Sequence, residues 1–328
     1  MRWIVKRAIH AALTIYLSMT ITFFLIRAMP GNPIEMLLVE YRLRGIPEEL
    51  AKAEIAALYN INLDEPWWSQ YLRYLWSLLH GDMGKTIISG ASVTECVMYG
   101  LPWTVFLVSL SLIISFVIGV TLGMLAAYRR GGIFDRIAST AASISQAFPN
   151  YIMAMLLLYY LAIQYKLFPA RGSYDINVKP GFTVEFISSV LYHAFLPMMA
   201  YVVTSFGGWM LAMRSSTIRV LGEDYVVAAE ARGLKSRRIA TTYVGRNAIL
   251  PLFAGFAIAL GYIFGGSTLI ETWFAYTGVG MVMGLALSYR DYPLIQGCFL
   301  IITVAVVVSN FIADIVYSKL DPRIRIGE

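Results

Sequence analysis

Six long stretches without Asp, Glu, Lys or Arg constrain this chain more than any other feature. They cover residues 8–26, 101–128, 137–165, 186–213, 247–270 and 292–313. Each has at least 19 residues, and a helix needs about 20 apolar residues to cross the hydrocarbon core of a bilayer. Only 14% of the residues are charged, against about 25% in soluble domains. We therefore predict an all-α integral membrane protein with six transmembrane helices, forming a single membrane domain over residues 1–328.

The distribution of basic residues predicts which side each loop faces. Sixteen of the 26 Lys and Arg residues fall in four segments that six spans would place on one side: three in 2–7, three in 129–136, seven in 214–246 and three in 319–325. Short basic segments next to spans stay in the cytoplasm. We therefore predict a multi-pass protein of the cell (plasma or inner) membrane with both termini inside. This topology accounts for the net charge of +6, and no nucleic-acid partner is needed to explain it.

The first connection, residues 28–100, is long and is predicted to lie outside the cell. A helix is expected over 47–59, where acids follow Pro47 in the first turn. A second is expected over 66–80, because its largest apolar residues share one face. These residues are Trp68, Leu72, Leu75, Trp76 and Leu79. Such a helix packs on the outer ends of the spans, lies at the membrane interface or contacts an extracellular partner; packing is the default expectation.

The polar stretch 214–251 is predicted to carry an ordered helix in the cytoplasm. Glu223 and Asp224 suit the positive end of a helix dipole, and Gly233 suits a left-handed stop at the other end. The residues between them are slim, with alanine at 228, 229 and 231. A helix of about ten residues is marginal alone in water, so it needs a docking partner. A solvated basic loop is the alternative, but the acidic start and the glycine stop favour docking.

The sequence carries no arrangement of residues typical of catalysis. Residues 81–86, GDMGKT, imitate a phosphate-binding loop, but Leu79 stands where that motif requires glycine. The three histidines, His10, His80 and His193, are isolated in the sequence. We therefore predict a chain that is not an enzyme and that binds no metal or cofactor itself.

Polar and small residues inside the predicted spans have two interpretations each. Gln146 and Asn310 are expensive at membrane depth, so they either line a hydrophilic path or bond a neighbouring helix. The pairs Gly119/Gly123 and Gly261/Gly265 allow close helix approach, either within this chain or between two chains.

Several sequence blocks resemble one transporter family. Residues 224–234 read DYVVAAEARGL, in which Ala228, Ala229 and Gly233 fit an EAA-x-x-x-G pattern and Val227 replaces its glutamate. Further blocks follow in order: RAMPGNP (27–33), LDEPWWSQYLRYLWSLLHGDMGKT (63–86), LPWT (101–104), FPARG (168–172), RNAILP (246–251), TGVG (277–280), RDYPLIQG (290–297) and LDPRIR (320–325). Together they resemble the dipeptide/oligopeptide permeases of binding-protein-dependent ABC importers, a subfamily that shares the missing glutamate.

This resemblance implies a type I ABC importer permease fold and a set of partners. The partners are a second, similar permease, two cytoplasmic ATPase subunits and an extracytoplasmic substrate-binding protein, with ATP and Mg²⁺ bound by the ATPases. The loop at 214–250 would be the coupling loop. Its implied ATPase contacts are Asp224, Tyr225, Ala228, Ala229, Glu230, Arg232, Gly233 and Leu234. Gln146 and Asn310 remain the candidates for a substrate path.

The implied cargo is a di- or oligopeptide, and related permeases leave two alternatives, oligosaccharides and nickel. A different class of function is a secondary carrier or channel that works alone. That class predicts charged or discontinuous spans at the bilayer midplane together with inverted repeats, and none of these is evident in the sequence.

Overall fold

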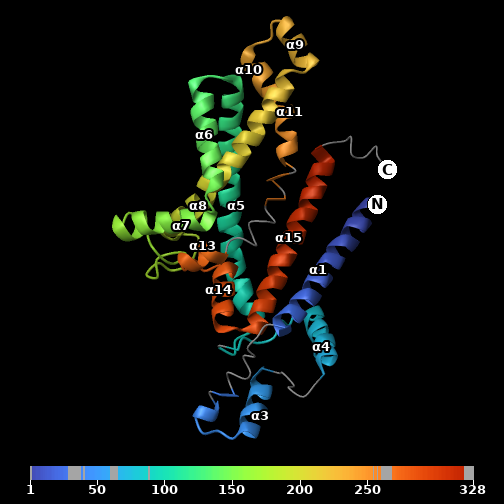
Figure 1. The fold of residues 1–328 in the computed structure, drawn as a ribbon, viewed down its shortest axis with the longest axis vertical. Helices are drawn as coiled ribbons and strands as arrows, with labels where there is room; N and C mark the ends of the chain where they lie inside the picture. Colours follow the sequence, from blue (N-terminus) through green and yellow to red (C-terminus); the bar gives the residue numbers. More distant parts are fainter. Residues whose placement is uncertain are drawn as a thin grey trace. The chain divides into compact units, whose positions relative to one another are not determined.

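The computed structural model describes residues 2–28, 38–39, 41–59, 66–87, 89–253, 255–256, 258–259 and 268–320, and most of them are helical. Within these ranges the chain forms no strand, only an isolated antiparallel bridge between Lys85 and Ser92. Figure 1 shows the helices coloured along the chain. They are α1 (Arg2–Ala28), α3 (Glu48–Tyr59), α4 (Trp67–Leu79), α5 (Val93–Tyr128), α6 (Ile133–Ala147), α7 (Asn150–Leu157), η1 (Leu158–Gln164), α8 (Val184–Leu221), α9 (Asp224–Ala231), α10 (Ser236–Arg238), η2 (Ile239–Gly245), α11 (Arg246–Ala248), α13 (Thr268–Trp273), α14 (Val279–Tyr289) and α15 (Tyr292–Leu320).

Four helices are long and apolar enough to cross a bilayer, and they coincide with four of the six predicted windows. The crossing stretches are Val5–Ile26, Val93–Tyr128, Val184–Leu221 and Tyr292–Phe311. The window 247–270 lies partly outside the described residues, as does most of the RAMPGNP block. The helices expected in the first connection are confirmed as α3 and α4.

The third window, 137–165, is not one straight helix. Its chain bends by 96° between α6 and the α7–η1 helix. Phe148 adopts an extended conformation, with φ −89° and ψ 124°, because the ring of the following Pro149 disfavours a helical residue before it. The uncharged window predicted one continuous span here, but the chain breaks at this proline. Taken as one broken crossing, the pair brings the number of crossings in the described part of the chain to five.

The chain divides into two compact units. Unit 1 comprises Met1–Thr104, Ser267–Thr272 and Tyr276–Val307. Its core joins α1, α5, α14 and α15 through nine buried side chains, which are Ile26, Val93, Val97, Val279, Met283, Ala286, Leu294, Ile295 and Cys298. Cys96 packs against this cluster, and both cysteines are free thiols. Unit 1 is therefore held mainly by aliphatic packing.

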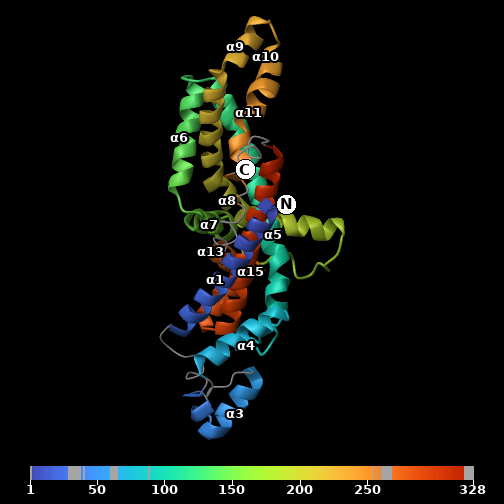
Figure 2. The ribbon, with the colours of Figure 1, turned by 90° about the vertical axis from the view of Figure 1, so that its right-hand side faces the viewer.

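Unit 2 comprises Val105–Gly266, Trp273–Ala275 and Val308–Glu328. Its centre is the packing of α8 against α5 and α6, and Figure 2 shows α6 running beside α8. A Cβ atom on Gly119 would lie 2.4 Å from the Cβ of Trp209, and one on Gly123 would lie 2.3 Å from the carbonyl oxygen of Met210. Only glycine permits this approach, so this pair of small residues serves packing within the chain. The second pair, Gly261/Gly265, lies outside the described residues.

Candidate functional site

The polar stretch 214–251 folds as a helical hairpin at the end of α8. This helix runs eight residues beyond the uncharged window and ends at Leu221, and only Gly222 and Glu223 separate it from α9. The chain then returns through α10, η2 and α11, as the orange segment of Figure 1 shows. Asp224 begins α9, where a negative charge interacts favourably with the dipole. The predicted helix thus exists and is joined almost directly to a long span.

Gly233 stops the hairpin helix in the predicted conformation. Its φ is +70°, a left-handed value that costs a residue with a side chain about 1–2 kcal/mol. Its N–H donates to the carbonyl of Glu230 at 2.8 Å, and the N–H of Leu234 donates to Ala229 at 3.3 Å. A Cβ at this position would meet nothing within 4 Å. Backbone conformation is therefore what requires glycine here.

One side of α9 packs against the returning segment of the same hairpin. Val226 and Ala229 are buried together with Ile239 and Val244 of η2. Leu234 and three other apolar residues, Val220, Leu221 and Tyr243, lie around this small core. A helix of this length is marginal alone in water and was predicted to need a docking partner. In the structure, η2 of the same chain packs against one side of α9, so only the other side is left for an external partner.

The other side of α9 is exposed. It carries charged or small residues next to two larger apolar ones, Tyr225 at 41% and Val227 at 55% exposure. Of the eight predicted contact residues, Ala229 is buried and Leu234 half-buried, whereas Asp224, Tyr225, Ala228, Glu230, Arg232 and Gly233 are exposed. The structure therefore separates residues that hold the hairpin together from residues that are free to contact a partner.

An ion pair connects the base of this hairpin to α6. The guanidinium of Arg214 on α8 binds both carboxylate oxygens of Asp135, with Nη2 donating to Oδ2 at 2.8 Å. Asp135 also accepts a hydrogen bond from the N–H of Gly131 at 2.9 Å. About two turns before Arg214 on α8, a Cβ on Gly207 would clash with the carbonyl oxygen of Ala142 on α6. Because this partly buried ion pair and the close backbone approach at Gly207 both join α6 to α8, the two helices pack as one block.

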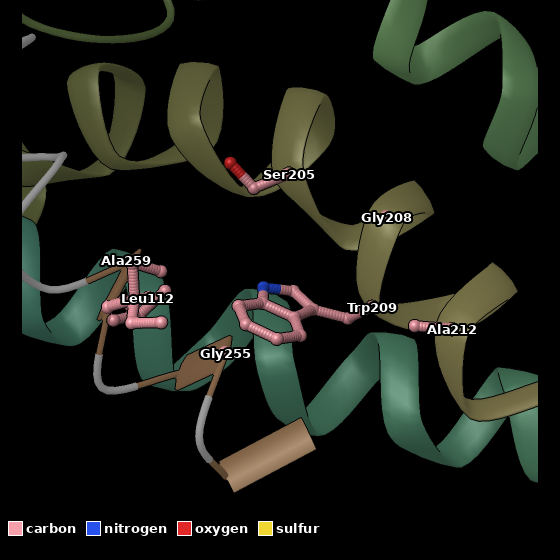
Figure 3. A pocket seen from close by; sticks show the side chains of 8 residues that line it. Leu112, Ser205, Gly208, Trp209, Ala212, Gly255 and Ala259 are labelled. Carbon is pink, nitrogen blue, oxygen red and sulfur yellow. The ribbon is translucent and has the colours of Figure 1, made fainter. Parts of the chain in front are cut away.

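Gln146 and Asn310, the candidates for a substrate path, have different surroundings. The Gln146 amide donates to the carbonyl of Ala142 on its own helix at 3.4 Å. Its Oε1 would lie 3.5 Å from a Cβ on Gly208, and Gly208, but not Gln146, lines a hollow. That hollow has a volume of about 420 Å³ and is lined by Leu112, Ser205, Gly208, Trp209, Ala212, Gly255, Ile258 and Ala259. Figure 3 shows the Trp209 indole lying between α8 and α5 in this hollow. The side-chain oxygen of Asn310 is buried and has no hydrogen-bond partner in the described part of the chain.

A buried carboxylate that the sequence analysis missed lies at the start of α14. Glu271 of α13 accepts hydrogen bonds from the Thr104 hydroxyl at 2.9 Å and from the N–H of Gly280 at 2.7 Å. The Thr104 oxygen in turn accepts from the N–H of Val279 at 2.8 Å. These contacts satisfy N–H groups that a helix start leaves without partners, and they join α14 to α5 within unit 1. The one sequence signal was an acid directly after the uncharged window 247–270.

Two family models match nearly the whole chain. The model described as "Binding-protein-dependent transport system inner membrane component" matches residues 119–326, and the model of the N-terminal part of such membrane components matches residues 1–109.

Curated relatives match over the same extent. The chain is 31% identical to the dipeptide transport system permease protein DppB of Escherichia coli K12, with 98% of each chain covered. It is 32% identical to DppB of Bacillus subtilis 168, covering 99% of this chain and 98% of that one. It is also 30% identical to the oligopeptide transport system permease protein AppB of the same Bacillus strain, with 98% of each covered.

Among solved structures, the chain resembles one from the MetNI methionine ABC transporter in inward-facing conformations. The TM-score is 0.54 at 16% identity, and the match covers 69% of this chain and 97% of that chain. At this identity the likeness concerns the fold alone.

Proposed function

The chain belongs to the family of binding-protein-dependent transport system inner membrane components and has the all-α fold of a type I ABC importer permease, and on this premise we propose its function. It is the permease subunit of an ATP-driven importer of di- and oligopeptides. It forms the translocation path with a second, homologous permease, and a substrate-binding protein delivers the peptide from outside.

The two-sided structure of α9 carries this proposal. The inner side of α9 packs against Ile239 and Val244. This apolar contact keeps the helix folded while its outer side remains free. The outer side combines the apolar surface of Tyr225 and Val227 with the small Ala228. A groove on an ATPase subunit is expected to receive this face, as an amphipathic helix lays its apolar side into a groove. Glu230 and Arg232 would lie at the polar rim.

The connection of α9 to the span suggests how ATP hydrolysis would drive transport. Because only two residues separate α9 from α8, a movement of α9 would also move the end of α8. The Asp135–Arg214 ion pair and the Gly207 contact pass it on to α6. We expect the block of α5, α6 and α8 to rotate as a rigid body, which is a general way to alternate access in transporters.

The path itself is proposed to run past Gln146 and Asn310. Gln146 lies beside Gly208, which lines the hollow around Trp209. The walls of this hollow are mostly apolar, as the walls of ligand sites commonly are. The buried oxygen of Asn310 has an unused acceptor position, which a peptide N–H or a group of the second permease would satisfy.

Peptides are the proposed cargo because the relatives named above are dipeptide and oligopeptide permeases. Oligosaccharides and nickel remain the alternatives for the same machinery. Competition separates the three: unlabelled dipeptides should reduce uptake of a labelled peptide, whereas oligosaccharides and Ni²⁺ should not.

The proposed arrangement in the cell membrane has both termini and the coupling loop 214–250 in the cytoplasm, and segment 28–100 outside. The chain forms a single membrane domain over residues 1–328. It catalyses no reaction and binds no cofactor, because ATP and Mg²⁺ belong to the two ATPase subunits.

Replacing Ala228 with Arg tests the assignment of the coupling face. The side chain of Ala228 is exposed, so Ala228→Arg should leave membrane insertion unchanged. A bulky charge in the proposed groove should reduce ATP-dependent peptide uptake at least about tenfold, equivalent to about 1.4 kcal/mol of lost contact. The assay uses the complete complex in proteoliposomes, with all partner subunits present.

Thr242→Arg is the matched control, since Thr242 is exposed on η2 of the same hairpin. Its uptake should stay near wild type. Unchanged uptake in Ala228→Arg would refute the coupling role of α9. Uptake by the purified chain alone, driven by a proton or sodium gradient without nucleotide, would instead support a secondary carrier.

A further inference from the structure

The helix α4 has three faces with different chemistry. Each residue turns a helix by about 100°, which places Tyr71, Tyr74 and Leu78 on one face. A second face carries the four exposed apolar residues Trp68, Leu72, Trp76 and Leu79. The third face carries the polar residues Ser69, Gln70, Arg73 and Ser77. We call the second face the Trp stripe.

The first face attaches α4 to the outer end of α1. The Tyr71 ring lies 5.1 Å from that of Phe23, edge to face, and the Tyr74 ring lies 5.3 Å from the same phenylalanine. The Tyr71 hydroxyl is also 2.7 Å from the Thr20 hydroxyl. These contacts fix the rotation of α4 about its own axis, so they also fix where the Trp stripe points.

The Trp stripe is unusually apolar for a surface exposed to water. Its members are between 55% and 81% exposed, and no residue of α4 is fully buried. Burying a side chain of this size is worth roughly 1.5–3 kcal/mol. A contiguous stripe of four such residues therefore indicates a partner.

The neighbourhood of the stripe indicates which partner. The exposed side of α1 next to α4 is also apolar, with Ile21 at 56%, Phe24 at 41% and Leu25 at 62% exposure. Phe24 contacts Trp67 of α4, with ring centroids 5.7 Å apart. The stripe thus continues the lipid-facing surface of a membrane span. Tryptophan is enriched where hydrocarbon meets water, and the polar face of α4 lies about 120° around the helix from the stripe.

We propose that α4 lies flat in the extracytoplasmic membrane–water interface, with the Trp stripe in the acyl region of the outer leaflet and Arg73 in the headgroup or water layer. The partner of this surface is the lipid bilayer. The assignment of α4 to the extracytoplasmic side of the membrane rests on the topology proposed above. The insertion of the Trp stripe into the acyl region does not depend on that topology.

Depth-dependent quenching tests the proposal. Leu72→Cys and Trp76→Cys are made where Cys96 and Cys298 are alanine, and each is labelled with an environment-sensitive fluorophore. The complete complex is placed in nanodiscs whose lipids carry bromine near the headgroup end of the acyl chains. An interfacial helix buries its apolar face by about 5–10 Å, so bromine should quench both labels strongly and aqueous iodide should quench them weakly.

Arg73→Cys is the matched control on the polar face of the same helix. Its label should respond to iodide and hardly to bromine. Iodide quenching at Leu72 and Trp76 that equals the quenching at Arg73 would overturn the proposal. So would protection that appears only when the binding protein is added, which would assign the stripe to protein docking. Protection from both quenchers, as expected for burial against the second permease, would overturn it too.

A membrane-impermeant thiol reagent distinguishes failure of the proposed topology from failure of this proposal. The reagent, added outside intact cells, should label Arg73→Cys. Labelling from the cytoplasmic side alone would contradict the topology, while the bromine measurement would still report whether the stripe is in lipid.

Discussion

The two short helices α4 and α9 both pack one side against the chain and leave another side free, but their free sides differ in chemistry. The free side of α9 mixes Tyr225 and Val227 with alanine and charged residues. The free side of α4 is a stripe of Trp and Leu. Their packed sides differ as well: α9 buries Val226 and Ala229 in a small core, whereas α4 rests on aromatic rings and a hydroxyl pair.

This difference teaches how an amphipathic helix indicates its partner. Small side chains and charges allow close, directional contact, which suits a protein groove. Bulky apolar side chains in a continuous stripe suit insertion among lipid acyl chains, which adapt to the shape of the side chains. Substitutions on the two helices should therefore affect peptide uptake very differently.

The largest effect is expected at the packed side of α9. Val226→Asp places a carboxylate in the small core, where an unpaired charge is very unfavourable, and Val226 is fully buried. The hairpin should unfold locally and uptake by the reconstituted complex should be abolished. Limited proteolysis should then cut within 222–245. Val227→Asp, one residue along and 55% exposed, should leave the hairpin resistant to protease. Equal resistance in both variants would mean that the small core does not hold α9.

A smaller effect is expected at the end of the same helix. Gly233→Val must adopt a left-handed conformation that costs about 1–2 kcal/mol, so α9 should end differently and uptake should fall about tenfold. Substrate-stimulated ATPase activity should fall in parallel, with normal membrane insertion. Gly45→Val is the control, because Gly45 has φ +76° and equally open surroundings but lies just before α3, away from the coupling loop. Equal losses in both variants would indicate general strain and not coupling.

The smallest effect is expected on the free side of α4. The double variant Trp68→Ser and Trp76→Ser weakens the proposed contact with lipid, but it leaves the contacts of Tyr71 and Tyr74 with α1 in place and changes no residue of the proposed coupling face. Uptake should therefore stay within about twofold of wild type, although bromine quenching of a label at Leu72 should weaken. A large loss of uptake that excess binding protein restores would show that α4 contacts that protein, and the comparison would fail.

Much of the fold follows from local sequence. The uncharged windows predict the long helices, and Asp224 and Gly233 predict both ends of α9 because dipole and backbone preferences act over a few residues. The break at Pro149 was also available from local rules, since the residue before proline avoids the helical region. It was missed because neighbouring spans often tolerate proline.

The pairings between distant residues did not follow from the sequence. Asp135 and Arg214 are 79 positions apart, and Thr104 and Glu271 are 167 apart. Nothing in either segment specifies the partner. The packing of α9 against Ile239 and Val244 was missed for the same reason, because these residues contact α9 only after the chain reverses direction. Gln146 and Asn310 were identified as costly polar groups, and their role in a path stays a prediction.

The length of α8 has a consequence for how the complex assembles. From Arg214 to Leu221 the helix continues past its uncharged window, which adds about 12 Å at 1.5 Å per residue. The headgroup layer on each side of a bilayer is only about 5–8 Å thick. In the proposed topology the free side of α9 would therefore stand clear of the lipid surface, so an ATPase subunit would need no affinity for membranes to reach it. Each copy of this chain presents one such hairpin, and the number of permeases would then set how many ATPases the membrane recruits.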